Sequence, residues 1–517
     1  MMIMYDMICT VDQMRRAEAI AAGSEDRNSK GFFGLMERAG EELASAVLSL
    51  TDEPDGKSVL ILCGKGNNGG DGFTAARLLS SRMRVTAALM SDKAPTGIAA
   101  EEFTRMQSYD VRTVPWSDVR TSDYDVIVDA VFGTGFHGEL PENVSLLFAD
   151  VMNSGALKIA ADIPSGIDAD TGSAARCAFS ADHTVTFGAV KLGMFQPKAK
   201  RLCGEIHTVA IGVEDALSSM PYVMRMMDEE TALAALPARH ELSHKGSFGK
   251  LLIAAGSRSM SGAAALSVRA ALSGGAGLVR LATVDTVADR VGAGIYEATY
   301  AILDHNAAGE ISATSLDRLE EELKICSAAA IGPGMGTSAD ISAVVGECIR
   351  ICGRERIPLV IDADGLNVLA GRADMTASFG CRAVMMPHPK ELSRLVGADP
   401  AEVTADRLRY AIELAEKSQA VVVSKGWPTY IISPDGRAYL SCTGNGGLSK
   451  GGSGDVLTGL TAGIIASNKG DRLFESACAA VYIFGAAADI TAQRLSMTGM
   501  LPSDVIYDMN EIFRRKN

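Results

Sequence analysis

The sequence lacks the features that mark exported and membrane-spanning proteins. Its first residues, MMIMYDMICTVDQMRR, include Asp6 and Asp12 and do not combine a basic start with an apolar stretch, as a secretory signal does. No apolar run approaches the roughly 20 residues needed to span a bilayer. The 10 cysteines stand singly, with no C-x-x-C spacing, which is typical of reduced and mostly buried thiols. We therefore expect a cytoplasmic protein that does not act at a membrane.

An excess of basic residues is also missing. The 49 Lys and Arg are outnumbered by 63 Asp and Glu, which gives a net charge of −14. Because nucleic-acid binding depends on clustered cations, this charge argues against a nucleic acid as the main partner. With 47% hydrophobic and 22% charged residues, 53 glycines and 16 prolines, the composition is that of a globular protein with many tight turns. A chain of 517 residues exceeds what one hydrophobic core usually holds, so two domains are expected.

Hydrophobic patterning predicts an α/β fold in both halves of the chain. Early in the sequence, apolar residues recur every four positions and indicate a helix with a buried stripe: Leu35, Ala39, Leu43 and Val47. Short apolar runs then end in glycine-rich or acidic loops and alternate with helix-length segments such as 73–82, which is the rhythm of a doubly wound sheet. The weaker segment near 213–228 divides a predicted domain 1–220 from a predicted domain 221–517.

One short motif is misleading when it is read alone. His240, Glu241 and His244 spell H-E-x-x-H, the pattern in which two histidines one helical turn apart bind zinc. Gly246 and Gly249 follow at once, so a continuous helix through both histidines is not expected. We interpret this segment as a polar loop that enters the second domain.

The segment 64–72, GKGNNGGDG, is the first candidate site. It follows the apolar run VLILC and leads into a helix predicted to begin near Phe73. Glycines let the backbone approach a ligand, and amides at a helix start favour an anion. A plain tight turn is the alternative, but it would not require four glycines, two asparagines and an aspartate. We predict a phosphate site.

Two aspartates end later strands of the same half. Asp129 precedes the loop 133–138, and Asp162 precedes the segment PSGID. Acidic groups at neighbouring strand ends can converge on a cation or act as an acid or base. Capping of the following helix is the common alternative for a single aspartate there.

The segment 444–455, GNGGLSKGGSGD, is the matching candidate in the second half. It runs directly into a helical pattern, so its amides would form an anion hole that stabilises charge on a phosphoryl group. Asp455 stands where it could take a proton from an attacking hydroxyl. An N-capping aspartate after a flexible turn would explain Asp455 but not the glycines before it. We predict phosphoryl transfer.

Together these motifs resemble two known families in a fixed order. MERAG, GKGNNGGDG, DAVFGTGFHGEL and DIPSGIDADTG resemble the NAD(P)H-hydrate epimerases. HKGSFGKLLIAAGS, IGPGMG, DADGLN, PHPKE and GGSGDVLTG resemble the NAD(P)H-hydrate dehydratases, whose fold is ribokinase-like. The order resembles that of the fused repair enzymes of prokaryotes. The resemblance implies two three-layer αβα domains, a Rossmann-like epimerase followed by a ribokinase-like dehydratase.

The resemblance implies that the first domain binds hydrated nicotinamide. The implied contacts are Asn67, Asn68, Gly69, Gly70, Asp71, Gly133, Thr134, Gly135, Phe136, His137, Gly138, Glu139 and Asp162. The residues implied to hold K⁺ are Asn68, Asp129 and Ser165. Interconversion of R and S hydrates makes and breaks bonds at C6 of the nicotinamide ring, and Asp162 is the predicted acid or base.

The resemblance implies that the second domain binds a nucleotide beside the hydrate. The implied nucleotide contacts are Lys425, Gly426, Trp427, Pro428, Thr429, Gly444, Asn445, Gly446, Gly447, Leu448, Ser449, Lys450, Gly451, Gly452, Ser453 and Gly454. The implied hydrate contacts are Ala263, Gly334, His388 and Asp455, with Asp455 as the base. Phosphorylation of the C6 hydroxyl would make it a good leaving group, which the ring nitrogen then expels. ADP with Mg²⁺ is implied, although nothing in the spacing distinguishes ADP from ATP.

Two positions depart from the family pattern. Phe484 stands where the family has a histidine, which puts nucleotide affinity or base preference in doubt, and Ser453 replaces the commoner threonine but keeps the hydroxyl. A ribokinase-type small-molecule kinase with a non-catalytic first domain is the alternative function, because the same anion hole and base would serve it. We also expect a homo-oligomer.

Overall fold

The computed structural model describes residues 7–91 and 93–516, which form two compact units. The first unit ends at Met226 and the second begins at Met227. The predicted boundary, between residues 220 and 221, falls between helix α7 (Glu214–Ser218) and strand β10 (Met224–Met226). Each unit contains its own sheet and its own candidate site, so each is described separately.

The first unit is built on a parallel sheet with a change of direction at its centre. Its strands lie in the order β4 (Val111–Pro115), β3 (Arg84–Leu89), β2 (Ser58–Cys63), β5 (Val126–Ala130), β6 (Leu157–Ala161), β7 (His183–Phe187) and β9 (Glu205–Val209). From β2 the successive strands are added toward one edge of the sheet, as β3 and β4. From β5 they are added toward the other edge, as β6, β7 and β9. In open α/β sheets ligands bind at such a switch point, beyond the carboxyl ends of the strands.

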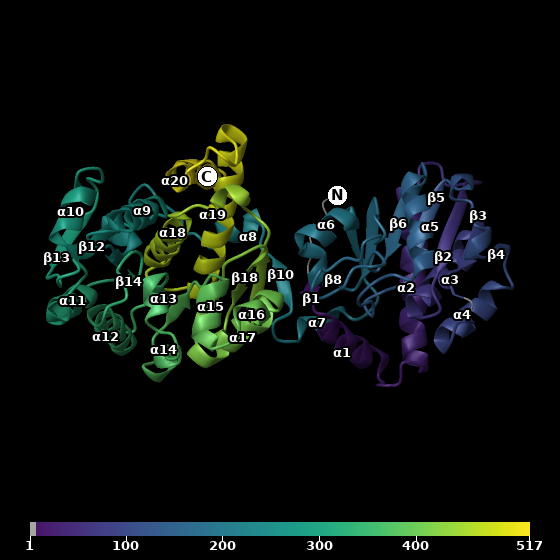
Figure 1. Ribbon diagram of the computed structural model, residues 1–517, viewed down its shortest axis with the longest axis horizontal. Helices are drawn as coiled ribbons and strands as arrows, with labels where there is room; N and C mark the ends of the chain where they lie inside the picture. The colour runs from purple at the N-terminus through teal and green to yellow at the C-terminus, as the bar shows by residue number, and fades with distance from the viewer. Residues whose placement is uncertain (1–6, 92, 517) are drawn as a thin grey trace. The chain divides into compact units, whose positions relative to one another are not determined.

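Helices cover both faces of this sheet, as the alternation of buried side chains requires (Figure 1). Val59 and Ile61 of β2 pack with α2 (Lys30–Leu50), α3 (Asn67–Leu79) and α4 (Ile98–Met106), whereas Leu60 and Leu62 pack with α5 (Glu142–Asn153). The remaining elements of the unit, apart from short 3₁₀ turns, are β1 (Ile8–Cys9), α1 (Val11–Ala22), β8 (Val190–Lys191) and α6 (Pro197–Cys203). The first unit is therefore a three-layer α/β/α sandwich.

Helix α3 begins earlier than the sequence predicts. We expected a helix from about Phe73, but α3 starts at Asn67, so Gly69, Gly70 and Asp71 are helical rather than part of a loop. The glycines are there for packing: a methyl group on Gly69 would lie 1.9 Å from the carbonyl oxygen of Gly64. The glycine-rich segment therefore allows the start of α3 to pack closely against the backbone at the end of β2.

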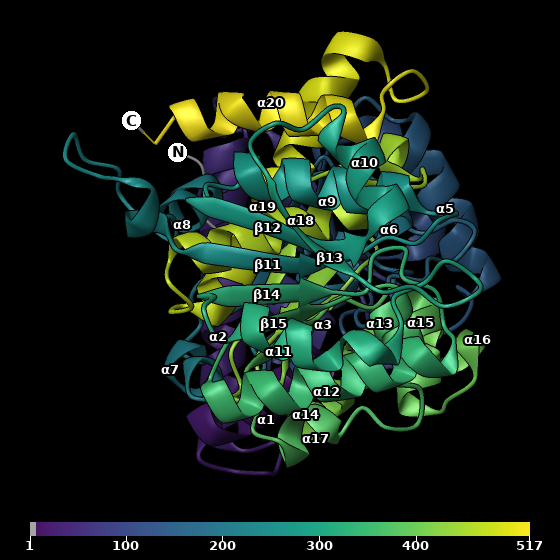
Figure 2. The same ribbon diagram turned by 90° about the vertical axis from the view of Figure 1, so that its left-hand side faces the viewer.

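The second unit has a larger sheet with its own switch point. Its strands lie in the order β13 (Thr299–Leu303), β12 (Leu278–Val284), β11 (Lys250–Ala254), β14 (Ala328–Ile331), β15 (Leu359–Ile361), β16 (Ala383–Met385), β17 (Val421–Ser424), β18 (Thr429–Ile432) and β19 (Ala438–Ser441). The strands from β13 to β17 are parallel, and β18 and β19 are antiparallel. Figure 2 shows β12, β11 and β14 side by side. All residues of β14 to β17 are buried, as expected for parallel strands between helical layers.

Several helices of the second unit begin at its candidate site, among them α15 (Pro389–Val396) and α18 (Ser453–Ser467). The helices of this unit are α8 (Glu229–Ala234), α9 (Ser261–Ser273), α10 (Asp285–Gly292), α11 (Leu316–Leu323), α12 (Ala339–Glu355), α13 (Asp364–Asn367), α14 (Met375–Ser378), α15, α16 (Pro400–Ala405), α17 (Arg407–Ser418), α18, α19 (Leu473–Leu495) and α20 (Pro502–Arg514). Helix α18 packs against α9 and against β11, β14 and β15. The predicted α/β class, with a largely parallel sheet in each half, is confirmed.

One helix has the length and apolar composition of a membrane span. Helix α19 has 23 residues and a mean hydropathy of 1.5 over its most apolar window. In the structure 67% of that window is buried, and α19 packs against α18 and α20. It occupies the position of a core helix in this unit.

Candidate active sites

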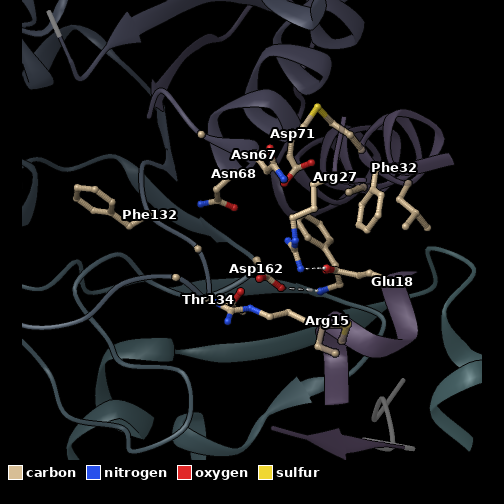
Figure 3. A pocket seen from close by; sticks show the side chains of 18 of the residues that line it. Arg15, Glu18, Arg27, Phe32, Asn67, Asn68, Asp71, Phe132, Thr134 and Asp162 are labelled. Atoms are coloured by element: carbon tan, nitrogen blue, oxygen red, sulfur yellow. Dashed lines mark hydrogen bonds and ion pairs between the residues drawn. The ribbon is translucent and has the colours of Figure 1, made fainter. Parts of the chain in front are cut away.

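The first candidate site is a pocket at the switch point of the first sheet. It encloses about 410 Å³ beyond the carboxyl ends of β2, β5 and β6. The structure brings together here many of the residues predicted for the epimerase site: Asn67, Asn68, Asp71, Gly133, Thr134, Gly135, Phe136 and Asp162. Figure 3 shows the labelled side chains of Asn67, Asn68, Asp71 and Asp162 around one cavity.

The other predicted residues of this domain lie outside the lining of that pocket. Gly69 and Gly70 face the packed side of α3, against the Gly64 carbonyl and the Met36 side chain. His137 is exposed, and its Nδ1 lies 2.6 Å from Oδ2 of Asp168. Gly138 and Glu139 are also exposed. The loop 133–139 thus contributes its first half to the pocket.

The start of α3 presents unsatisfied backbone groups to the pocket. Gly66 is the N-cap, and no side chain of the described residues caps this helix. Lys65, Gly66 and Asn67 all line the cavity. The first amides of a helix have no partners within the helix and carry a partial positive charge, so this end can hold an anion.

Asp162 is held in an ion pair that the sequence analysis did not identify. The fully buried ammonium group of Lys191 donates to Oδ1 of Asp162, and the Phe187 amide donates to the same oxygen over 3.2 Å. Thr186 Oγ1 lies 3.4 Å from that oxygen. Asp162 has a φ of 66°, an uncommon conformation for a residue other than glycine. A lysine inside the apolar run FGAVKLGMF was the available signal, because a buried lysine needs a partner.

A second group of charged residues lines the same pocket and was also missed. Arg15, Glu18 and Arg27 come from α1 and the segment after it, and Arg27 lies 3.3 Å from Glu18. Burial, together with the carboxylates of Asp162 and Glu18, raises the pKa of Asp71 well above its ordinary value. The pocket therefore combines acidic groups of shifted pKa with cations near its walls.

Asp129 and Ser165 form a buried oxygen cluster beneath the pocket. The Ser165 amide and hydroxyl each donate to the Asp129 carboxylate over 2.7 Å. Burial raises the pKa of Asp129 to about 6, although these hydrogen bonds act to lower it. Nδ2 of Asn68 is buried with no hydrogen-bond partner among the described residues. Among the described residues no cation lies in hydrogen-bond contact with the buried Asp129 carboxylate, so its oxygens can hold a monovalent cation. The unpartnered Asn68 nitrogen is a donor and does not itself contribute to such a site.

The second candidate site is a larger pocket of about 770 Å³ in the second unit. It lies between the end of β17, the start of α15, the segment before α18, and α19. The structure brings together here most of the residues predicted for the dehydratase: His388, Lys425, Gly426, Trp427, Thr429, Gly444, Asn445, Gly446, Leu448, Ser449, Lys450, Ser453 and Gly454. Phe484, the position that departs from the family, also lines it.

Lys425 is the centre of a buried charge network beside this pocket. Its ammonium group lies 2.7 Å from Oδ1 of Asp362 and 3.8 Å from Oε2 of Glu391. Thr458 of α18 donates to the other oxygen of Asp362 over 2.6 Å. Burial acts to lower the pKa of Lys425, but the two carboxylates outweigh it and the pKa is raised. Asp362 and Glu391 were missed as individual residues, although both stand in quoted motifs, DADGLN and PHPKE.

Asp455 lies in the first turn of α18, next to this network. Burial, with the neighbouring carboxylates of Asp362 and Asp364, raises the pKa of Asp455 to about 6. A methyl group on the preceding Gly454 would lie 3.6 Å from Nζ of Lys425, so the start of α18 and the ion pair are in contact. A carboxyl group with such a pKa can exchange protons near neutrality.

The start of α18 is open toward the pocket. No side chain caps the helix, and its N-cap Gly452 has a φ of 100°, which favours glycine. The hydroxyl of Ser453 is buried and has no hydrogen-bond partner in the described part of the chain. Uncapped amides and a spare hydroxyl at one helix end suit a phosphate group.

His388 caps α15 in its neutral form. Its Nδ1 accepts from the amides of Lys390 and Glu391 over 3.1 and 3.2 Å, and its own amide donates to the Glu391 carboxylate over 2.8 Å. Burial, then the charge of Lys425, lowers the pKa of His388. Its remaining ring nitrogen, Nε2, therefore carries the proton.

Some predicted residues of the second domain lie outside the pocket lining. They are Ala263, Gly334, Pro428, Gly447, Gly451, Gly452 and Asp455. Ala263 and Gly334 lie against each other, because a methyl group on Gly334 would come within 2.9 Å of the Ala263 side chain. The segment with His240 and His244 is not helical, which agrees with its interpretation as a loop.

Comparison with known proteins identifies relatives for both halves. Residues 251–510 match a family model described as NAD(P)H-hydrate dehydratase, and residues 33–193 match one described as the YjeF-related protein N-terminus. The bifunctional NAD(P)H-hydrate repair enzyme Nnr of Thermofilum pendens is 36% identical over 92% of this chain and 91% of its own length. The enzyme of that name from Escherichia coli is 32% identical over 97% of this chain and 93% of its own.

A solved structure is similar to part of this chain. The ADP/ATP-dependent NAD(P)H-hydrate dehydratase from Bacillus subtilis, co-crystallised with ATP/Mg²⁺, is 30% identical and has a TM-score of 0.49. The match covers 58% of this chain and 99% of the Bacillus chain.

Proposed function

The chain belongs to the bifunctional NAD(P)H-hydrate repair enzymes, and we propose that its two pockets carry out the two steps of that repair. The first unit interconverts the R and S hydrates of NADH and NADPH, and the second dehydrates the S hydrate while consuming a nucleotide. The observation that carries this conclusion is the extent of the match. A single bifunctional relative aligns with 92% of this chain, so the match includes both units.

Asp162 acts as the acid and base of the epimerisation. The Lys191, Thr186 and Phe187 contacts all involve Oδ1, which leaves Oδ2 for the substrate. In its protonated form Asp162 gives a proton to the C6 hydroxyl as the C–O bond breaks. The departure of water leaves the ring as a planar cation. Water then adds to either face of C6 and returns a proton to Asp162. The uncapped start of α3 holds the phosphates of the substrate.

The oxygen cluster beneath the first pocket fits K⁺. Asn68, Asp129 and Ser165 would hold the ion with their side-chain oxygens, and Asn68 would turn its amide oxygen inward to do so. When bound, K⁺ supplies positive charge that neutralises Asp129 and fixes the loop 133–136 against the substrate. This role accounts for the buried carboxylate of Asp129, which has no cation among its hydrogen-bond partners.

Asp455 acts as the base of the dehydratase. It takes the proton of the C6 hydroxyl while the oxygen attacks the terminal phosphoryl group of the nucleotide. The uncapped amides and Ser453 hydroxyl at the start of α18 stabilise the charge that develops on the phosphoryl oxygens. The ring nitrogen then expels phosphate from C6, and loss of a proton from C5 restores the reduced nicotinamide. Lys425, fixed by Asp362, neutralises the nucleotide phosphates.

The nucleotide is ADP, accompanied by Mg²⁺. Asp362 and Glu391 both lie beside one ammonium group, Lys425, so carboxylate oxygens are available for a divalent cation. The nucleotide phosphates would supply most of its ligands, and Glu391 could add a protein oxygen. With ADP the products are NAD(P)H, phosphate and AMP.

A stoichiometric assay tests this function. The purified protein is given S-hydrate with ADP or ATP and Mg²⁺, and the return of reduced-nicotinamide absorbance is compared with the phosphate and nucleotide released. We expect equal amounts of NADH, phosphate and AMP with ADP. A ribokinase-type kinase would instead transfer phosphate to another alcohol and restore no absorbance from either nucleotide, and that result would contradict the proposal.

A further inference from the structure

Three potential metal ligands lie together on the first unit, away from its pocket. His183 begins β7, and Glu205 begins the neighbouring strand β9. The two strands are parallel, with His183 paired to Glu205 and Val185 paired to His207. Because side chains alternate between the faces of a sheet, Glu205 and His207 emerge on the same face as His183.

This cluster lies at the edge of the sheet opposite the active-site pocket. Phe187, the last residue of β7, lines the pocket. His183 is the first residue of the same strand, so at about 3.3 Å per residue the two ends are about 13 Å apart. His183, Glu205 and His207 are absent from the lining of the pocket. Changes in the cluster can therefore be separated from changes in catalysis.

Two of the separations between the ligand atoms are close to those of a tetrahedral metal site. Nδ1 of His183 lies 3.1 Å from Nε2 of His207 and 3.6 Å from Oε2 of Glu205. One ligand atom from each residue can be chosen so that all lie within 4.8 Å of one another. Metal–ligand distances of about 2.0–2.1 Å at tetrahedral angles place neighbouring ligands about 3.3 Å apart. The two separations, 3.1 Å and 3.6 Å, fall on either side of this spacing of about 3.3 Å.

The charges around the cluster suit a cation. Two imidazoles are ligands that bind such ions in their neutral form. Glu205 supplies a negative charge. The nearby lysine, Lys158 of β6, is already engaged, because its ammonium group lies 3.6 Å from the Asp182 carboxylate and donates to the Ala156 carbonyl over 3.1 Å.

We propose that His183, Glu205 and His207 bind a divalent transition-metal ion of the zinc class, with water as the fourth ligand. Two imidazoles and one carboxylate favour zinc and its neighbours over Ca²⁺ or Mg²⁺, which prefer oxygen ligands. The ion joins the start of β9 to β7. Within the described residues β9 pairs with β7 alone, so a metal bound there anchors an edge strand of the sheet.

Calorimetric titration of the full-length, chelator-treated protein with ZnCl₂ tests the proposal. We expect one ion per chain with a Kd of about 10 μM or tighter, and a loss of at least about a hundredfold in affinity in the His183→Ala/His207→Ala variant. Glu205→Gln, a milder change at an exposed side chain, should weaken binding about tenfold. Saturating Zn²⁺ should raise the thermal unfolding midpoint of the wild-type protein by roughly 5 °C and leave the double variant unchanged.

His240→Ala/His244→Ala is the matched control, because it removes two histidines from the H-E-x-x-H segment and leaves the cluster intact. It should bind Zn²⁺ like the wild type. Loss of binding in this control, equal binding by the wild type and the His183→Ala/His207→Ala variant, or a wild-type Kd weaker than about 1 mM would each overturn the proposal. Epimerase activity, measured without added metal, verifies that the double variant is folded. If it is not, the Glu205→Gln titration decides.

Discussion

Lys191 donates to one oxygen of Asp162, and Asp162 lines the pocket of the first unit. The lysine side chain is fully buried, and it also donates to the Phe187 carbonyl and to Thr186 over 3.0 Å each. Its position is therefore fixed from three sides. Because the ammonium group cannot move away, the Asp162 carboxylate stays in the geometry that proton transfer at C6 requires.

Replacement of Asp162 by asparagine should abolish epimerisation without affecting dehydration. The amide keeps the size of the side chain but cannot transfer a proton, so the rate of R-to-S conversion should fall by about 10²- to 10⁴-fold. Chromatographic separation of the epimers measures this rate. The S-hydrate dehydratase activity of the same variant is the internal control and should equal that of the wild type. Unchanged R-to-S conversion would remove Asp162 from the mechanism.

The dehydratase should lose activity as the pH falls through about 6. Burial raises the pKa of Asp455 to about 6, and the base must be deprotonated to act, so activity is present above that pKa and lost below it. At one pH unit below the pKa only about a tenth of the molecules remain active. The measurement is kcat/KM for S-hydrate from pH 5 to 8.

Glu391 provides the control for this profile, because burial raises its pKa as well. Glu391→Gln removes that titration and keeps an oxygen that can accept from the His388 amide. The loss of kcat/KM at low pH should persist in this variant. If Glu391→Gln no longer loses activity at low pH, the titrating group is Glu391 and not Asp455.

Gly69→Ala should destabilise the first unit. The added methyl group would lie 1.9 Å from the carbonyl oxygen of Gly64, so the start of α3 must move away from β2. We expect a loss of about 1–3 kcal/mol in the free energy of unfolding, measured by urea denaturation. Gly155→Ala is the matched control, because nothing lies within 4 Å of its added methyl group. Equal stability of the two variants would show that α3 is not packed in this way.

Phe484→Ala should weaken nucleotide binding. The ring lines the second pocket and is 7% exposed. An aromatic face that stacks on a base contributes about 1–3 kcal/mol, or about 5- to 150-fold in Kd. Calorimetric titration with ADP measures the change, and Phe484→His should retain most of the affinity. Phe379→Ala removes an exposed ring outside the pocket and should have no effect. If the two alanine variants bind ADP equally, Phe484 does not contact the nucleotide.

Local patterns predicted the parts of the sites that lie close together in sequence. The apolar run before Gly64 identified a strand, a turn and a helix start, because propensity and backbone conformation are local properties. The glycines before Asp455 identified a turn and a helix start. The start of α3 was placed too late because glycines were interpreted as a loop. In the structure their small size serves close packing against β2, which depends on a contact with Gly64 that the pattern did not show.

The charge networks could not be predicted in the same way. The pairs Lys191–Asp162 and Lys425–Asp362 join residues that are 29 and 63 positions apart. Their pairing depends on strand order and register, which the separate apolar runs do not specify. Each lysine was visible as a single charge beside an apolar segment, but only the fold supplies its partner.

The most direct test of the two-site account is a mixing experiment with R-hydrate, ADP and Mg²⁺. Asp162→Asn alone should restore reduced-nicotinamide absorbance only at the rate of uncatalysed epimerisation, and Asp455→Asn alone should restore none. An equal mixture of the two variants should restore it at a rate approaching that of the wild type, because each supplies the site that the other lacks. A mixture no faster than Asp162→Asn alone would contradict the assignment of one step to each pocket.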